Sequence, residues 1–261
     1  MYRVTFSGAI IDLDGTVYLG DSLIPGAEQG IEKLRSSGVD LLFFSNNPTK
    51  TPEEFAAHLT ELGISVTPHE ILTSAVVTRE YLLNNHREDD IFVVGERGFT
   101  KQISDLSITE NPEEADVLVG SIDRSFAYDT LVDALTAYRG KEPTFLGTDP
   151  DRAIPVGNGR KIPGSGAIIG AIASTTGRNP DKVLGKPSQY AVDVCLRHLE
   201  ADPSECLVVG DRLDTDIDMG ENAGMTTTLV LTGVDDRDSL SESSIKPDHV
   251  LDSLAEVGGL L

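Results

Sequence analysis

The chain has 261 residues and a formal net charge of −22, from 43 acidic and 21 basic side chains. Such an excess of negative charge argues against binding to nucleic-acid phosphates and to anionic lipid. No apolar stretch of about 18 residues and no signal peptide are visible, so we expect a cytoplasmic protein without a membrane span. Two cysteines, Cys195 and Cys206, are too few for a disulfide framework and are expected to be reduced.

Strand and helix patterns alternate through the first part of the chain. Residues 4–13 read as a buried strand, and Pro25 opens an amphipathic helix. Residues 39–45 form a short continuous apolar run, which is typical of a central parallel strand. Residues 51–54 and 67–70 are both helix-start signals. Each has Thr as the cap, Pro in the first helical position and Glu in the third.

The same alternation continues to the end of the chain and predicts an α/β fold with parallel sheets. The Pro- and Gly-rich stretch 148–166 interrupts it and is expected to be a functional loop or a crossing between domains. Further strands are expected at 91–95, 117–120, 144–146, 207–210 and 227–231, and further helices near 128–138 and 166–175.

The sharpest motif is DLDGT, which begins at Asp12 directly after the first expected strand. Parallel α/β proteins bind ligands beyond the carboxyl ends of their strands, and the motif places Asp12 and Asp14 there. Two carboxylates so close repel each other, a conflict that a divalent cation such as Mg²⁺ removes. A turn that merely contains two acids is the simpler alternative, and the motif's place after a buried strand disfavours it.

Two weaker motifs would suit a phosphate group. Ser45 and Asn46 follow the second expected strand, where a hydroxyl, an amide and backbone N–H groups suit an anion, although such residues are also ordinary turn chemistry. In GKPS, Lys186 precedes a helix that Ser188 can cap, and its ammonium offers a point charge to phosphoryl oxygens. Alone, the first motif is weak, and a solvated loop lysine is the favoured interpretation of Lys186.

A second group of acids, GDRLDTD, follows the expected strand 207–210. Asp211 lies nearest the strand and is the better candidate metal ligand. Asp214 and Asp216 could simply cap the next helix and complement its dipole.

The motifs DLDGT, SNN, GKPS and GDRLDTDI, in this order, resemble those of the haloacid dehalogenase (HAD) superfamily over essentially the whole chain. Within it, the chain resembles the NagD and p-nitrophenyl phosphatase group. The resemblance implies a Rossmann-like parallel-sheet core built from residues 1–74 and 182–261. It also implies an inserted α/β cap domain at 75–181 that sets substrate specificity.

The resemblance also implies catalytic roles. Asp12 would be the nucleophile that forms an aspartyl-phosphate, and Asp14 would be the general acid and then the general base. Ser45 and Asn46 would bind the phosphoryl group, and Lys186 would steady its charge and that of Asp12.

The implied cofactor is Mg²⁺. Its ligands would be Asp12, the backbone carbonyl of Asp14, and Asp211, with Asp216 orienting a water bound to the metal.

The implied function is Mg²⁺-dependent hydrolysis of small phosphomonoesters, such as p-nitrophenyl phosphate, phosphoglycolate, or sugar and nucleotide phosphates. A dehalogenase of the superfamily would need neither a metal nor a second acid like Asp14. A non-catalytic phosphate-sensing or scaffold homologue and another HAD-type phosphotransferase remain alternatives. The physiological substrate and the choice between monomer and homodimer stay open. Asp149 stands where many relatives have Asn, so no relative's substrate is carried over.

The acidity itself predicts a salt dependence. With 25 Asp against 8 Lys, the surface repels itself at low ionic strength and is screened at high ionic strength. If the protein is adapted to high salt, its melting temperature will rise as KCl is increased from low to molar concentration. A melting temperature that stays flat across the titration would identify it as an ordinary acidic protein.

Overall fold

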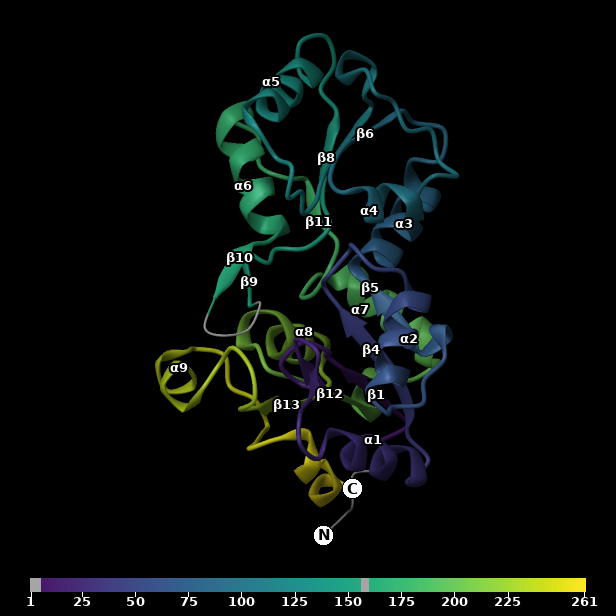
Figure 1. Ribbon diagram of the computed structural model, residues 1–261, viewed down its shortest axis with the longest axis vertical. Coiled ribbons are helices and arrows are strands. Elements are labelled where there is room, and N and C mark those ends of the chain that lie inside the picture. Colours follow the sequence, from purple (N-terminus) through teal and green to yellow (C-terminus); the bar gives the residue numbers. More distant parts are fainter. Residues whose placement is uncertain (1–5, 156–159) are drawn as a thin grey trace. The chain divides into compact units, whose positions relative to one another are not determined.

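The computed structural model describes residues 6–155 and 160–261, which form two compact units (Figure 1). Unit 1 takes in Met1–Ser45, Pro52–Leu72 and Lys186–Leu261, and unit 2 takes in Asn46–Thr51 and Thr73–Gly185. Two of these divisions lie near the sequence-based boundaries at residues 74 and 182. No helix among the described residues is long and apolar enough to cross a membrane.

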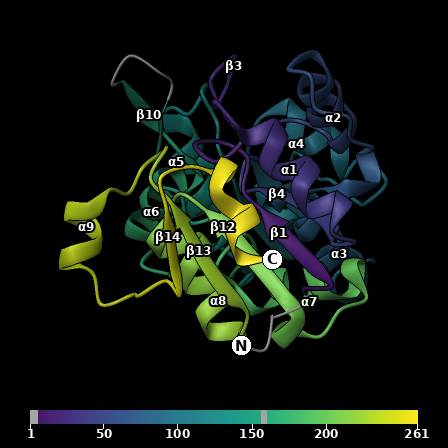
Figure 2. The same ribbon diagram turned by 90° about the horizontal axis from the view of Figure 1, so that it is seen from below.

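Unit 1 is built on a six-stranded sheet in the order β14-β13-β12-β1-β4-β5, and the neighbours from β14 to β4 all pair in parallel (Figure 2). The central strand β1 is fully buried, and its Ile11 lies opposite Phe43 of β4 and Val209 of β12. The strands are β1 (Gly8–Ile11), β4 (Asp40–Ser45), β5 (Ile71–Thr73), β12 (Cys206–Gly210), β13 (Thr226–Val230) and β14 (His249–Leu251).

Helices complete the core of unit 1. Ile31 and Leu34 lie one turn apart on α1 and join Ile11, Phe43 and Val209 in one buried cluster, which explains why the predicted amphipathic helix forms there. The helices are α1 (Ala27–Ser36), α2 (Pro52–Glu61), α7 (Gln189–Leu199), α8 (Asp218–Ala223) and α9 (Arg237–Glu242), with the 3-10 turns η1 (Pro68–Glu70), η3 (Pro203–Glu205) and η5 (Leu254–Leu260), the π turn η4 (Leu213–Ile217) and the hairpin β2 (Tyr18–Leu19) and β3 (Ser22–Leu23).

Unit 2 has its own parallel sheet, in the order β11-β8-β7-β6. Figure 1 shows α5 and α6 on one side of this sheet and α3 and α4 on the other. Leu118 and Phe145 of the sheet pack with Ile169 and Ile172 of α6. The elements are β6 (Ile91–Val94), β7 (Val117–Gly120), β8 (Thr144–Gly147), β11 (Lys182–Val183), the hairpin β9 (Ala153–Pro155) and β10 (Lys161–Pro163), α3 (Ser74–Asn85), α4 (Arg97–Gln102), α5 (Tyr128–Ala137), α6 (Ser165–Thr176) and the turn η2 (Pro112–Glu114).

Two local expectations need correction. The stretch 148–166 lies wholly within unit 2 and contains the hairpin β9–β10, so it is not a crossing between domains; residues 156–159 lie outside the described residues. The start signal at 67–70 does form a capping box, in which the Thr67 backbone N–H donates to Glu70 Oε2 at 2.8 Å. It produces only the single turn η1 because β5 begins immediately afterwards.

A buried carboxyl group follows β8 in unit 2. Asp149 is 1% exposed, and its Oδ2 accepts a hydrogen bond from Thr148 Oγ1 at 2.9 Å. Burial, and then the negative charge of Asp151, raise the pKa of Asp149 to about 8. Because the folded state favours the neutral form, Asp149 lowers stability progressively as pH rises from about 4 toward 8.

Replacing Asp149 with Asn should therefore stabilise the protein most at the upper end of this range. We expect Asp149→Asn to raise the free energy of unfolding by about 1–3 kcal/mol at pH 8, with a smaller gain at pH 5. Denaturant unfolding of both proteins at each pH measures this difference. The exposed Asp129→Asn is the control; an Asp149→Asn gain that does not grow with pH would show that Asp149 is ionised in the folded protein.

Candidate active site

The parallel register of unit 1 brings three of the predicted site residues to one edge of its sheet. Ile11 pairs with Phe43 on one side and with Val209 on the other, so all three strands end together. Asp12 directly follows β1, Ser45 ends β4 and Asp211 directly follows β12. We call this edge the carboxyl edge, and it is where parallel α/β folds place their ligand sites.

Lys186 holds two carboxylates of the site together. Its ammonium donates to Asp12 Oδ1 at 2.5 Å, to Asp216 Oδ1 at 2.7 Å and to the backbone carbonyl of Phe44 at 3.0 Å. The Lys186 side chain is only 3% exposed. An ammonium group has three protons to donate, and three acceptors lie within hydrogen-bond distance of this one.

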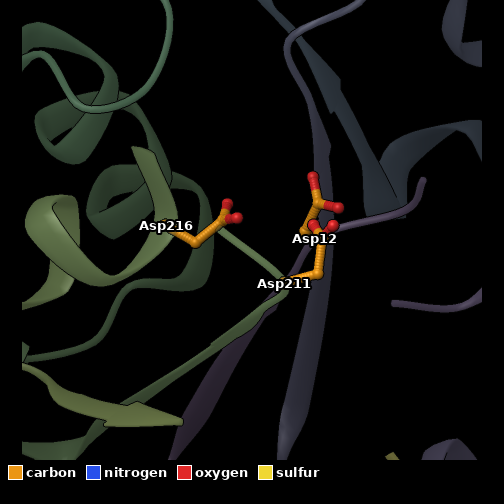
Figure 3. A group of neighbouring side chains, drawn as sticks. All are labelled: Asp12, Asp211 and Asp216. Carbon is orange, nitrogen blue, oxygen red and sulfur yellow. The ribbon is translucent and has the colours of Figure 1, made fainter. Parts of the chain in front are cut away.

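Asp12, Asp211 and Asp216 gather their carboxylates into one cluster. Each offers an oxygen atom within 4.8 Å of the others, and Figure 3 shows Asp12 and Asp211, which follow β1 and β12, side by side with Asp216 of η4 facing them. Asp216 is 1% exposed, and its second oxygen accepts the Arg212 backbone N–H at 3.2 Å. We expected Asp216 to orient a water bound to the metal, and its carboxylate lies in the same cluster as those of Asp12 and Asp211.

Two glycine backbones lie directly against the Asp211 carboxylate. Its Oδ2 accepts the Val234 backbone N–H at 2.6 Å, and a Cβ atom added to Gly15 or Gly233 would collide with its carboxylate. Thr232 Oγ1 donates to the Gly15 carbonyl at 2.5 Å and ties the two loops together. The glycines thus let two loop backbones approach one carboxylate directly.

The charges of the cluster are not balanced by protein groups alone. Burial raises the pKa of Asp12 to about 7, because the nearby charge of Asp216 adds to the burial while Lys186 opposes it only in part. The pKa of Asp211 lies well above its usual value, first through burial and then through Asp12 and Asp216. Three acids around one lysine therefore favour a further cation.

The donor set fits a divalent metal ion. Asp211 Oδ1 is buried, and among the described residues it has no hydrogen-bond partner, although a buried oxygen normally has one. Carboxylate oxygens are the hard ligands that Mg²⁺ and similar ions prefer. Asp12 and Asp211 are the side chains best placed to hold the ion, while Lys186 and a backbone N–H already occupy the two oxygens of Asp216.

Asp14 lies beside this cluster and is bound by Tyr18. The Tyr18 hydroxyl donates to Asp14 Oδ2 at 3.4 Å. Between them, Gly15 has a φ of 88°, a conformation that glycine adopts without strain, and its N–H donates to the Tyr18 carbonyl at 2.8 Å. The two carboxyl groups of DLDGT therefore lie in different environments, since Asp12 is bound by Lys186 and Asp14 by Tyr18.

Ser45 and Asn46 are buried, with exposures of 4% and 7%. Ser45 belongs to unit 1, whereas Asn46 is assigned to unit 2, where its backbone carbonyl accepts a hydrogen bond from Ser74 Oγ at 2.7 Å. Unit 1 on its own thus provides Asp12, Asp14, Ser45, Lys186, Asp211 and Asp216.

Several groups of this site were not predicted from the sequence. The Phe44 carbonyl is a backbone group, so no residue type in the sequence identifies it. Its role depends on where the Lys186 side chain places its ammonium group. Gly233 has no side chain, and its role depends on how closely its backbone approaches Asp211 in the folded chain. Tyr18 follows DLDGT closely, and a buried tyrosine hydroxyl usually has a hydrogen-bond partner, which is the one signal that could have found it.

An aspartate cluster around a buried lysine, at the carboxyl edge of a Rossmann-like sheet, defines the class of site. A family model described as haloacid dehalogenase-like hydrolase matches residues 9–109, and a second, described as HAD-hydrolase-like, matches residues 183–257. The 5'-nucleotidase YutF of Bacillus subtilis is 36% identical over 252 residues, which are 97% of this chain and 97% of that protein.

Solved structures agree with these sequence matches. The p-nitrophenyl phosphatase from Archaeoglobus fulgidus superposes with a TM-score of 0.91 at 34% identity, over 98% of this chain and 100% of that one. NagD from Escherichia coli K-12 gives a TM-score of 0.85 at 29% identity, over 97% and 98%. The glycerol phosphate phosphatase Rv1692 from Mycobacterium tuberculosis, solved in complex with magnesium, gives 0.86 at 27% identity, over 97% and 76%.

The chain therefore belongs to the haloacid dehalogenase-like hydrolases and, within them, to the NagD-like group of phosphatases. The predicted α/β fold with a Rossmann-like core is confirmed.

The close approach of Gly233 to Asp211 gives a test of the metal site. In Gly233→Ala the new methyl group must displace the Asp211 carboxylate, so we expect Mg²⁺ affinity, measured by calorimetry, to fall at least about 10-fold. Gly170→Ala is the matched control, because a Cβ there meets open space. Unchanged Mg²⁺ affinity in Gly233→Ala would mean that Asp211 does not bind the metal.

Proposed function

We propose that this phosphatase hydrolyses the phosphomonoesters of small metabolites with Mg²⁺ as its cofactor, through an aspartyl-phosphate on Asp12. The observation that supports this most directly is the Asp12 carboxylate, bound by Lys186 and placed beside an Asp211 oxygen that has no hydrogen-bond partner among the described residues. A carboxylate and a phosphate ester repel each other, and Lys186 together with a bound metal ion would supply the positive charge that lets them meet.

In the first step, a carboxylate oxygen of Asp12 attacks phosphorus and the bond from phosphorus to the ester oxygen breaks. Asp14 gives its proton to the departing oxygen, because an alkoxide is a poor leaving group. Lys186 favours the ionised form of Asp12 and orients it, and Ser45 and Asn46 bind the phosphoryl oxygens. Mg²⁺, bound by Asp12, Asp211 and the Asp14 carbonyl, would offset the negative charge of the phosphoryl group.

In the second step, water attacks phosphorus and the aspartyl-phosphate bond breaks. Asp14, which lost its proton in the first step, accepts one proton from the attacking water. Inorganic phosphate leaves and both carboxyl groups return to their starting states. Dividing the hydrolysis in this way replaces one difficult displacement by two easier ones.

The substrate class rests on the relatives. Their names specify a 5'-nucleotidase, a p-nitrophenyl phosphatase and a glycerol phosphate phosphatase, which share only the phosphomonoester. We propose that the partner is a small phosphorylated metabolite, selected by the inserted unit 2. Cys195 and Cys206 are both free and buried, which is compatible with the proposed cytoplasmic location.

Removing the nucleophile tests this function. Asp12→Asn should lose detectable release of phosphate from p-nitrophenyl phosphate, because an amide does not attack phosphorus. Asp21→Asn, an exposed acid nearby in the sequence, should keep wild-type activity. Chelation of the metal with EDTA should stop the wild-type reaction, and added Mg²⁺ should restore it.

Wild-type turnover in Asp12→Asn would contradict the proposal, because it would exclude an aspartyl-phosphate on Asp12. A wild-type protein that binds phosphate but hydrolyses none of a panel of nucleotide, sugar, glycerol and glycolate phosphates would instead be the non-catalytic homologue.

A further inference from the structure

Tyr18 closes the loop that carries both acids of DLDGT. Its backbone N–H donates to the Leu13 carbonyl at 3.2 Å and its carbonyl accepts the Gly15 N–H at 2.8 Å. Its hydroxyl returns to the same loop and donates to Asp14 Oδ2 at 3.4 Å. The Tyr18 backbone thus binds the residues on both sides of Asp14, and its side chain binds Asp14 itself.

The ring of Tyr18 is fixed by packing. Tyr18 is 4% exposed, and it belongs to the buried cluster of unit 1 together with Val17 and Phe55. His58 of α2 contacts it in an edge-to-face arrangement, with ring centroids 5.0 Å apart. Since the ring has little freedom to rotate, the position of its hydroxyl is set before any substrate binds.

We propose that Tyr18 is a positioning residue for proton transfer by Asp14, which deepens the proposed function and rests on it. By donating to Oδ2, the hydroxyl sets the rotation of the Asp14 carboxyl group, so that Oδ1 transfers the proton to the leaving oxygen. In this step the O–H bond on Asp14 breaks and a new O–H bond forms on the departing alcohol. Tyr18 keeps its own proton throughout.

The contribution of Tyr18 grows as the reaction proceeds. A hydrogen bond donated to a carboxylate is about twice as strong as one donated to a neutral acid. Asp14 becomes a carboxylate as its proton leaves, so the bond from Tyr18 strengthens toward the transition state and lowers the barrier. The resting distance of 3.4 Å is long, as hydrogen bonds of catalytic groups often are before substrate binds.

Substrates with different leaving groups distinguish a positioning role of Tyr18 in proton transfer from a purely structural role. p-Nitrophenolate leaves as a stable anion and needs little help from an acid, whereas an alkyl alcohol must be protonated. In Tyr18→Phe, which keeps the ring and loses the hydroxyl, we expect kcat/KM for glycerol phosphate to fall about 10- to 100-fold. We expect kcat/KM for p-nitrophenyl phosphate to stay within about twofold of wild type.

Two further variants serve as a positive comparison and a negative control for Tyr18→Phe. Asp14→Asn should show the same selectivity for the good leaving group with a larger loss, about 10²- to 10⁴-fold for the alkyl ester. Tyr128→Phe removes a hydroxyl from a tyrosine that is 80% exposed and should change neither substrate. Thermal unfolding of each variant confirms that equal amounts of folded enzyme are compared.

Equal losses of kcat/KM for both esters in Tyr18→Phe, or no loss for either, would overturn the role of Tyr18. Neither result would affect the proposed function, which fails only if the wild-type protein lacks phosphatase activity or Asp12→Asn retains it.

Discussion

The site depends on one buried ammonium group that binds two carboxylates at once. Burying a charged lysine costs several kcal/mol unless its protons are bound, and Lys186 binds Asp12, Asp216 and the Phe44 carbonyl. Because a third acid, Asp211, lies in the same cluster, the protein retains an excess of negative charge there. The local electrostatics therefore hold a carboxylate ready to react and also create the demand for a metal ion.

The sheet makes this arrangement possible without long-range adjustment. Asp12 and Asp211 are far apart in the chain, and they meet because β1 and β12 pair in register and end at one edge. Lys186, 174 positions from Asp12, reaches them from the segment that precedes α7. Gly15 and Gly233 then bring two loops against Asp211 at distances that no side chain would permit. The donors are thus fixed by backbone geometry before a substrate arrives, which is the condition under which electrostatic stabilisation is most effective.

The sequence predicts strands that form continuous apolar runs, and it predicts site residues that lie within short recognisable motifs. β4, β7 and β12 are short apolar runs bounded by polar turns, and they form at nearly the expected positions. β1 is shorter than the expected strand 4–13, whose first two residues lie outside the described residues. α3 was not predicted, because its buried face includes the polar Ser74 and Thr78 and shows no apolar stripe. Likewise Asp12 and Lys186 could be identified from motifs, whereas the Phe44 carbonyl and the Gly233 contact exist only in the folded chain.

The strong acidity of the chain has a consequence for its chemistry. A net charge of −22 repels a phosphomonoester dianion over distances comparable to the Debye length, about 8 Å at physiological ionic strength and about 3 Å at 1 M salt. The contacts of Lys186 are much shorter and lie inside the protein, where salt screens them little. High salt would therefore remove the barrier to substrate approach while leaving the buried cluster intact, so an acidic surface and an anionic substrate are compatible where salt is abundant.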